Sequence, residues 1–154
     1  MAAGKFKVHN RTWLRNGDST FNYTANTFKM ILLASTSNIT LSVGTGLYGD
    51  LTGELATANG YTSGGITLTG VTWTGTAGTV TLTCTAPVWT ATGTLTWRWW
   101  AIYASGTLNG QVNPLVGFAL ADTTPADSTT TAGNTLTITP NASGLYTNSG
   151  AQID

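Results

Sequence analysis

Charged side chains are scarce in this sequence. Only 8% of the 154 residues are Asp, Glu, Lys or Arg, against about 25% in an ordinary soluble domain. There is one histidine, His9, and one glutamate, Glu54. Acid–base catalysis needs paired carboxylates or a histidine with an acidic partner. We therefore predict no catalytic residues, and we expect His9 to be a surface residue of a basic strand rather than a base.

Patterns that bind metals or cofactors are also missing. The single cysteine, Cys84, excludes an intrachain disulfide and a cysteine metal cluster. It alternates with Val80 and Leu82, which predicts a small buried apolar group rather than a nucleophile. Asp122 and Asp127 share one loop, where we expect them to cap turns rather than bind calcium. We expect no metal and no cofactor.

Long apolar runs are absent as well. The apolar run over residues 30–34 is far too short to span a membrane. The first residues, MAAGKFKVHN, lack the apolar segment of a secretory signal. No glycine-rich phosphate loop occurs. We expect no membrane and no nucleic acid among the partners, and synthesis in the cytoplasm of the producing cell.

Threonine, glycine and tryptophan are abundant instead. About a fifth of the residues are threonine, which favours strands, and there are 19 glycines and six tryptophans. This composition predicts one all-β domain over residues 1–154, a jelly-roll-like antiparallel β-sandwich. The strands are expected at residues 5–14, 28–33, 66–73, 79–86, 94–103, 112–120, 135–139 and 145–147, with a polar loop over 121–134.

One short helix is predicted over residues 50–59. Asp50 is a suitable N-terminal cap, and Leu51, Leu55 and Ala58 fall on one helical face. Asn59 and the glycine after it form a typical helix end. Gly53 weakens this prediction.

The stretch TLTWRWWAIY, residues 94–103, predicts the longest strand. Strict alternation places Leu95, Trp97, Trp99, Ala101 and Tyr103 on one face, and Thr96, Arg98, Trp100 and Ile102 on the other. The first face is apolar throughout, so we expect it in the core. Arg98 and Trp100 on the second face are candidates for a self-contact near the surface. A loop covering that face is the alternative.

Positive charge is concentrated near the beginning of the chain. Lys5, Lys7, Arg11, Arg15 and Lys29 are opposed there only by Asp18, whereas the remainder is mildly acidic. Residues 1–18 are thus predicted to act as a docking strand or arm, with Lys5, Lys7, Arg11 and Trp13 as its interface candidates. Contact with an acidic partner, contact between neighbouring copies and simple solvation all remain open.

Several stretches together resemble a family of small virion proteins of tailed bacteriophages. They are TFKMILLAST (27–36), GDLTGELATANGYTSGG (49–65), LTGVTWT (68–74), PVWTATGTLTWRWWAIY (87–103), FALADTTPADST (118–129) and GNTLTITPNASGLYT (133–147). The resemblance implies a structural role in the virion without catalytic residues. It implies a capsid decoration or cement subunit, which binds the major capsid protein or other virion subunits and also itself, for example as a trimer.

Two other functions remain as alternatives. One is a neck or tail accessory subunit. The other is a carbohydrate-binding receptor-recognition sandwich that uses an exposed Trp13 or Trp89 as a sugar platform. A small hydrolase is disfavoured by the shortage of acid–base groups.

Overall fold

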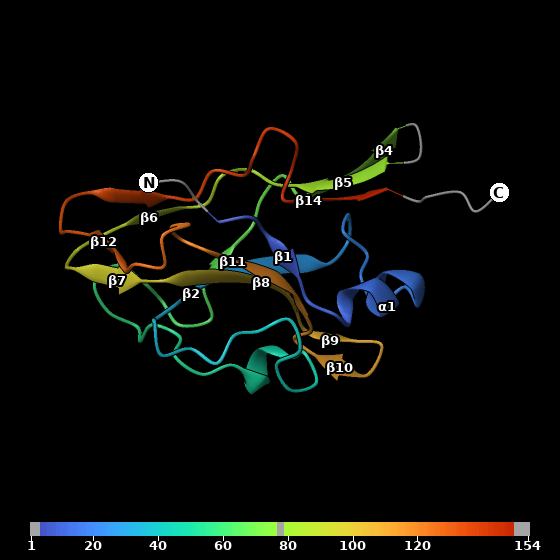
Figure 1. Ribbon diagram of the computed structural model, residues 1–154, viewed down its shortest axis with the longest axis horizontal. Coiled ribbons are helices and arrows are strands. Elements are labelled where there is room, and N and C mark those ends of the chain that lie inside the picture. The colour runs from blue at the N-terminus through green and yellow to red at the C-terminus, as the bar shows by residue number, and fades with distance from the viewer. Residues whose placement is uncertain (1–3, 77–78, 150–154) are drawn as a thin grey trace.

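The computed structural model describes residues 4–76 and 79–149 (Figure 1). Strands dominate these ranges, and all of the strand pairs are antiparallel. One α-helix of six residues, α1 (Thr12–Gly17), lies within them. The predicted all-β antiparallel fold with one short helix is confirmed, although the helix lies elsewhere in the chain.

A five-stranded sheet forms the centre of the molecule. Its order is β1–β11–β8–β2–β3. β2 and β8 pair along their whole length, from Thr27 opposite Ser105 to Leu33 opposite Trp99. The strands are β1 (Lys7–Val8), β2 (Thr27–Leu33), β3 (Ile66–Thr67), β8 (Trp99–Ser105) and β11 (Leu115–Leu120).

Smaller sheets complete the architecture. A three-stranded sheet has the order β14–β5–β4, and β12–β7, β13–β6 and β10–β9 form two-stranded sheets. These strands are β4 (Thr72–Thr76), β5 (Thr79–Thr83), β6 (Val88–Thr90), β7 (Leu95–Trp97), β9 (Thr107–Leu108), β10 (Gln111–Val112), β12 (Ser128–Thr130), β13 (Thr135–Thr137) and β14 (Tyr146–Ser149).

The central sheet is covered on both faces. Above it in Figure 1 lies a layer that contains β4, β5, β6, β12 and β14, and below it runs the loop that follows β2. The first cover buries the larger apolar cluster, which includes Met30, Leu32 and Ile102. The loop, with its short 3-10 helix η1 (Tyr48–Asp50), buries a second cluster around Ile31 and Leu33. Double coverage explains why β2 and β8 are apolar at nearly every position.

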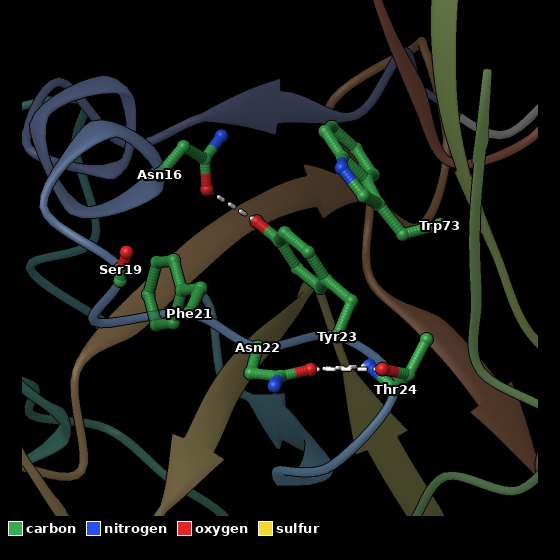
Figure 2. Close-up of a pocket in the computed structure, with 7 residues that line it drawn as sticks. All are labelled: Asn16, Ser19, Phe21, Asn22, Tyr23, Thr24 and Trp73. Carbon is green, nitrogen blue, oxygen red and sulfur yellow. Dashed lines mark hydrogen bonds between the residues drawn. The ribbon is translucent and has the colours of Figure 1, made fainter.

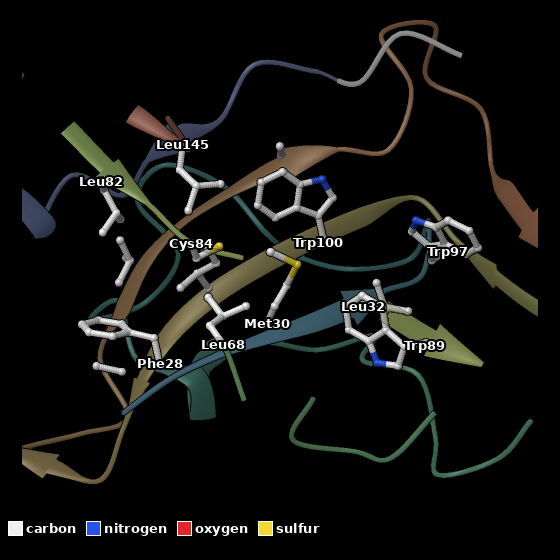
Figure 3. Close-up of a cluster of buried hydrophobic side chains, with 14 of the residues drawn as sticks. Phe28, Met30, Leu32, Leu68, Leu82, Cys84, Trp89, Trp97, Trp100 and Leu145 are labelled. Atoms are coloured by element: carbon white, nitrogen blue, oxygen red, sulfur yellow. The ribbon is translucent and has the colours of Figure 1, made fainter. Parts of the chain in front are cut away.

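The tryptophan stretch does not form one continuous strand. The chain bends at Arg98, which separates β7 from β8 and shifts the alternation of side chains by one position. Trp97 and Trp100 therefore enter the same large core cluster (Figure 3), whereas Trp99 packs against the second cluster. Trp100 is 6% exposed. The predicted arrangement of faces holds up to Trp97 and is wrong beyond it, and the expected position of Trp100 near the surface is wrong.

The predicted helix over residues 50–59 is also wrong. Residues 51–59 are not helical, because their backbone pairs with the end of β2 instead. Ala34 donates to the carbonyl of Gly53 at 2.7 Å, and Leu55 donates to the carbonyl of Leu32 at 3.1 Å. Gly53 has a φ of 78°, which a right-handed helix does not accept.

The predicted strand over residues 5–14 is replaced by β1 and α1. The chain turns between them, where Thr12 donates to the carbonyl of His9 at 2.9 Å. The Thr12 hydroxyl then bonds the carbonyl of Val116 in β11 at 2.8 Å. This bond ties the first turn of the helix to the central sheet.

The remaining strand predictions are largely confirmed. β2, β5 and β13 match the predicted ranges closely. The predicted strand over residues 66–73 is divided at Gly70, whose φ of 57° lets β3 and β4 enter different sheets. The loop over residues 121–134 contains the short strand β12, which pairs with β7.

The bend at Arg98 predicts a large difference between deleting and replacing this residue. Deletion would turn Leu95 and Trp97 away from the core, so we expect the free energy of unfolding to fall by more than about 4 kcal/mol. Arg98→Ala removes only a partly exposed ion pair with Asp127 at 2.9 Å, which costs less than about 1 kcal/mol. Urea unfolding of both variants measures the difference, and similar losses would contradict the assigned bend.

Candidate docking groove

An open groove of about 850 Å³ lies between the beginning and the end of the described chain. One wall is the segment of residues 4–8 together with Trp13 of α1. The other wall is the segment of residues 139–147, and Trp100 also lines the groove. We call this feature the docking groove. It brings together residues that are more than 120 positions apart in the sequence.

Aromatic rings form the apolar part of the docking groove. Phe6 stacks on Trp100 with ring centroids 5.3 Å apart and on Tyr146 at 6.2 Å. Trp13 meets Tyr146 edge-on at 6.0 Å. Trp13 remains 47% exposed. Its indole is therefore a large apolar surface that this chain leaves open to a partner.

Both walls contain the outer strand of a sheet. β1 is the last strand of the five-stranded sheet, and β14 is the last strand of the three-stranded sheet. Consecutive residues, 4–6 on one side and 145–147 on the other, line the docking groove. β1 contributes Val8 to this lining, and β14 contributes Tyr146 and Thr147.

Helix α1 is fixed under Trp13 by a buried arginine. Arg15 is 1% exposed, although we expected it among the surface charges of the basic segment. Its guanidinium donates to the side-chain oxygen of Gln111 at 2.7 Å and to the carbonyls of Gly46 at 2.8 Å, Thr45 at 3.0 Å and Leu115 at 3.2 Å. Arg15 therefore joins the helix to both the loop layer and the central sheet.

His9 is also buried rather than exposed, which corrects the prediction for this residue. Its Nδ1 accepts a hydrogen bond from the backbone N–H of Arg11 at 3.2 Å. Burial and the nearby Arg15 charge lower the pKa of His9 below 6.5. His9 is thus neutral at pH 7 and serves the turn between β1 and α1.

The acidic residues of the described chain are occupied by internal hydrogen bonds. Asp18 and Asp50 accept bonds from backbone N–H groups and threonine hydroxyls in their own loops. These bonds hold the pKa of both carboxyls below the usual value of 3.8. Asp122 accepts a backbone bond at 3.2 Å, as predicted for a turn cap, and Asp127 pairs with Arg98.

Glu54 is the most heavily bonded carboxylate. It accepts hydrogen bonds from the hydroxyls of Tyr48 and Tyr61 and from the backbone of Gly64. Tyr103 stacks on Tyr48 at 4.6 Å and donates to the carbonyl of Gly64 at 2.8 Å. Burial raises the pKa of Tyr103 to about 12, so this phenol stays a neutral donor. The cluster joins the loop layer to β8.

The exposed cations near the docking groove form no ion pair with any residue that the structure describes. Lys5, Lys7 and Arg11 are all exposed, and the Arg98–Asp127 pair is the one ion pair found within residues 4–76 and 79–149. Lys5 lines the docking groove directly, whereas Lys7 and Arg11 belong to the same segment outside it. A chain of zero net charge thereby has a positively charged face.

A smaller hollow of about 240 Å³ is lined by Asn16, Tyr23 and Trp73, among others (Figure 2). The Tyr23 hydroxyl donates to Asn16 Oδ1 at 2.9 Å and lies 2.9 Å from the Tyr146 hydroxyl. Trp73 stacks on Tyr23 at 4.7 Å. Asn16, Tyr23 and Trp73 therefore hold the Tyr146 hydroxyl in position. Burial raises the pKa of Tyr23 and of Tyr146.

The structure gathers some of the predicted interface residues and separates others. Lys5, Trp13 and Trp100 line the docking groove together, Trp100 as a buried wall. Arg98 is part of neither wall. Sequence reasoning missed Phe6 and Tyr146, because their proximity arises only from the packing of β1 against the layer that contains β14.

Two other residues can now be placed. Trp89 is buried, so it is not the sugar platform that we considered. Cys84 is buried, as predicted, and burial raises its pKa to about 11. Among the residues that the structure describes, no group of three or more His, Cys, Asp or Glu side chains is placed to hold a metal ion.

Comparison with known proteins identifies no relative: no family model, no curated protein and no solved structure matches this chain. None of the helices in the described part of the chain is long and apolar enough to cross a membrane.

A conservative substitution of Arg15 tests whether this residue anchors α1. Arg15→Lys keeps the positive charge but loses the planar fork that reaches several carbonyls at once. We expect the free energy of unfolding to fall by about 2–3 kcal/mol, since buried donors and acceptors lose their partners. Chemical denaturation measures this loss. An unchanged stability would contradict the anchoring role of Arg15.

His9 predicts a pH dependence of stability. Its pKa is lower in the folded chain than the unfolded value of 6.5, so its contribution is complete above about pH 6.5. The contribution is lost as the pH falls toward the lowered pKa. Asp18 and Asp50 also have lowered pKa values, but they act below pH 3.8.

In His9→Asn the amide oxygen takes the place of Nδ1 without titrating in this range. We expect the variant to lose the decline in stability that begins near pH 6.5 and to keep the decline at lower pH. Thermal unfolding across pH 2–8 measures both declines. Parallel curves for the variant and the natural chain would show that His9 is not the titrating group.

Proposed function

We propose that this chain is a non-enzymatic structural subunit of a bacteriophage virion that decorates the head and stabilises it by bridging capsid proteins. The sequence resemblance to small phage virion proteins supports this role. The scarcity of acid–base groups and the internal use of the described carboxylates support a binding function over a catalytic one.

One observation supports docking most directly: exposed cations with no ion-pair partner among the described residues lie on the segment that also carries an exposed tryptophan. Lys5, Lys7 and Arg11 supply the charge, and Trp13 supplies an apolar anchor. Anchors of this kind contribute much of the binding energy in protein interfaces, and surrounding charges favour encounter with an opposite surface. The partner of this face is therefore an acidic virion surface, such as one on the major capsid protein.

The stabilising mechanism is mass action. A subunit that binds only the assembled shell shifts the equilibrium toward that shell. Each weak contact gains from repetition over many copies, and a homo-oligomer would engage several capsid subunits at once. The buried position of Trp100 removes it as a self-contact, so any contact between copies must use other residues.

Glycan binding is a second candidate. The half-exposed indole of Trp13 stands beside the polar residues Asn141 and Ser143 in the docking groove. An aromatic platform with neighbouring amide and hydroxyl groups is suited to neutral sugars. A glycan array with the purified protein separates the two candidates, because a capsid subunit with this charged face requires no sugar ligand.

The proposed role predicts where the protein is found and how it binds. Antibody labelling should detect it on purified particles of the phage that encodes it. Simultaneous Lys5→Glu, Lys7→Glu and Arg11→Glu changes should reduce its affinity for particles that lack it by at least about tenfold, because attraction becomes repulsion. Co-sedimentation measures the occupancy.

A matched control carries new glutamates at exposed positions away from this segment, at Thr90, Thr129 and Thr135. It should bind nearly as well as the natural chain. Absence of the protein from purified particles would overturn the proposed function. Equal binding of the charge-reversed chain and the natural chain would overturn the docking face.

A further inference from the structure

We propose that the docking groove accepts an extended acidic segment of the partner protein, which pairs as an added strand with the free edge of β1 or β14. This inference rests on the proposed function, since it names the kind of partner segment that the same face would bind. It adds a binding mode and a ligand chemistry that the charge pattern alone does not provide.

The arrangement of the two outer strands favours the addition of a strand. Within the described chain β1 pairs only with β11, and β14 pairs only with β5. The outer edge of a strand carries backbone donors and acceptors that can pair with another strand. Proteins use such edges to bind extended peptides. Here both outer strands contribute residues to the same groove, Val8 from β1 and Tyr146 and Thr147 from β14, so an inserted segment would lie next to one or both of them.

The aromatic lining of the docking groove favours binding because its rings are already held in place. Phe6 is held between Trp100 and Tyr146, and Tyr146 is held in turn by the hydrogen bond to Tyr23. The groove wall is therefore rigid before a partner arrives, which lowers the entropy cost of binding. Alternate side chains of an added strand would point toward this wall, with Trp13 at the open side.

The positive charge at the docking groove indicates that the bound partner segment is acidic. Lys5 lines the docking groove, and Lys7 and Arg11 flank it along the chain without ion-pair partners among the described residues. An acidic segment would supply those partners. A second copy of this chain is a poor source, because its described carboxylates already hold their own loops or Arg98.

A nucleic acid fits the docking groove less well. Binding of a phosphate backbone relies on a series of cations along its path. Only one cation, Lys5, is among the residues that line the groove. The strand edges also offer backbone pairing, which a peptide can use and a phosphate chain cannot use in the same register.

The test uses the purified full chain and a displayed library of random peptides. We expect the selected peptides to be rich in Asp and Glu, with apolar residues at alternate positions. For a selected peptide, Trp13→Ala and Lys5→Glu should each weaken binding by about tenfold or more, as measured by calorimetry. Binding should also weaken with rising salt concentration.

Leu14→Ala is the matched control for Trp13→Ala. Leu14 is the next residue of α1 and is 67% exposed, but it does not line the docking groove. This variant should bind the peptide as the natural chain does. Hydrogen exchange supplies the structural readout, because a bound peptide should protect backbone amides in β1 or β14.

Four outcomes would overturn the inference. They are selection of peptides without acidic residues, equal effects of the Trp13 and Leu14 variants, protection at neither edge strand, and displacement of the peptide by single-stranded oligothymidylate or by neutral sugars. None of these measurements uses a phage particle. The inference can therefore fail while the protein is found on the virion, and it can succeed while the protein is absent from it.

Discussion

The burial of the central sheet on both faces is the constraint on which this structure depends. Two apolar faces require two covers, and a chain of 154 residues does not supply two further complete sheets. One cover is a layer of short strands, which satisfy their own backbone groups. The other is a loop, whose backbone must find hydrogen-bond partners one at a time. Several charged side chains of this protein form hydrogen bonds that hold this loop in place.

Arg15, Asp50 and Glu54 illustrate how the loop layer is held. Each accepts or donates several hydrogen bonds to backbone or tyrosine groups, so a few charged side chains replace a regular ladder. This internal use has an effect on the outside of the molecule. The carboxylates are drawn into loops, whereas the lysines near the beginning of the chain are not. Surface charge therefore differs from the charge that composition suggests.

Alternation of apolar and polar residues was enough to predict β5 and β13, and a short apolar run was enough to predict β2. The bend at Arg98 could not be predicted. Its neighbours contain no glycine or proline, and the apolar residues on both sides of it satisfy either arrangement of faces. The bend becomes favourable only because the core above β8 needs both Trp97 and Trp100.

The predicted helix over residues 50–59 is absent for a related reason. Spacing of Leu51, Leu55 and Ala58 suits a helix, but the free end of β2 offers backbone partners that compete with it. Gly53 was the one local signal against a helix. In the docking groove, the cations and Trp13 were visible in the sequence. Phe6 and Tyr146 were not, because only the packing of distant strands brings them together.

The state of Cys84 has a consequence for where this protein can function. Its sulfur is buried, and with a pKa of about 11 it is overwhelmingly the unreactive thiol at neutral pH. It has no second cysteine in these 154 residues with which to pair. A change from reducing to oxidising surroundings would thus neither create nor break a disulfide within this chain, so the fold does not depend on the redox state of the medium.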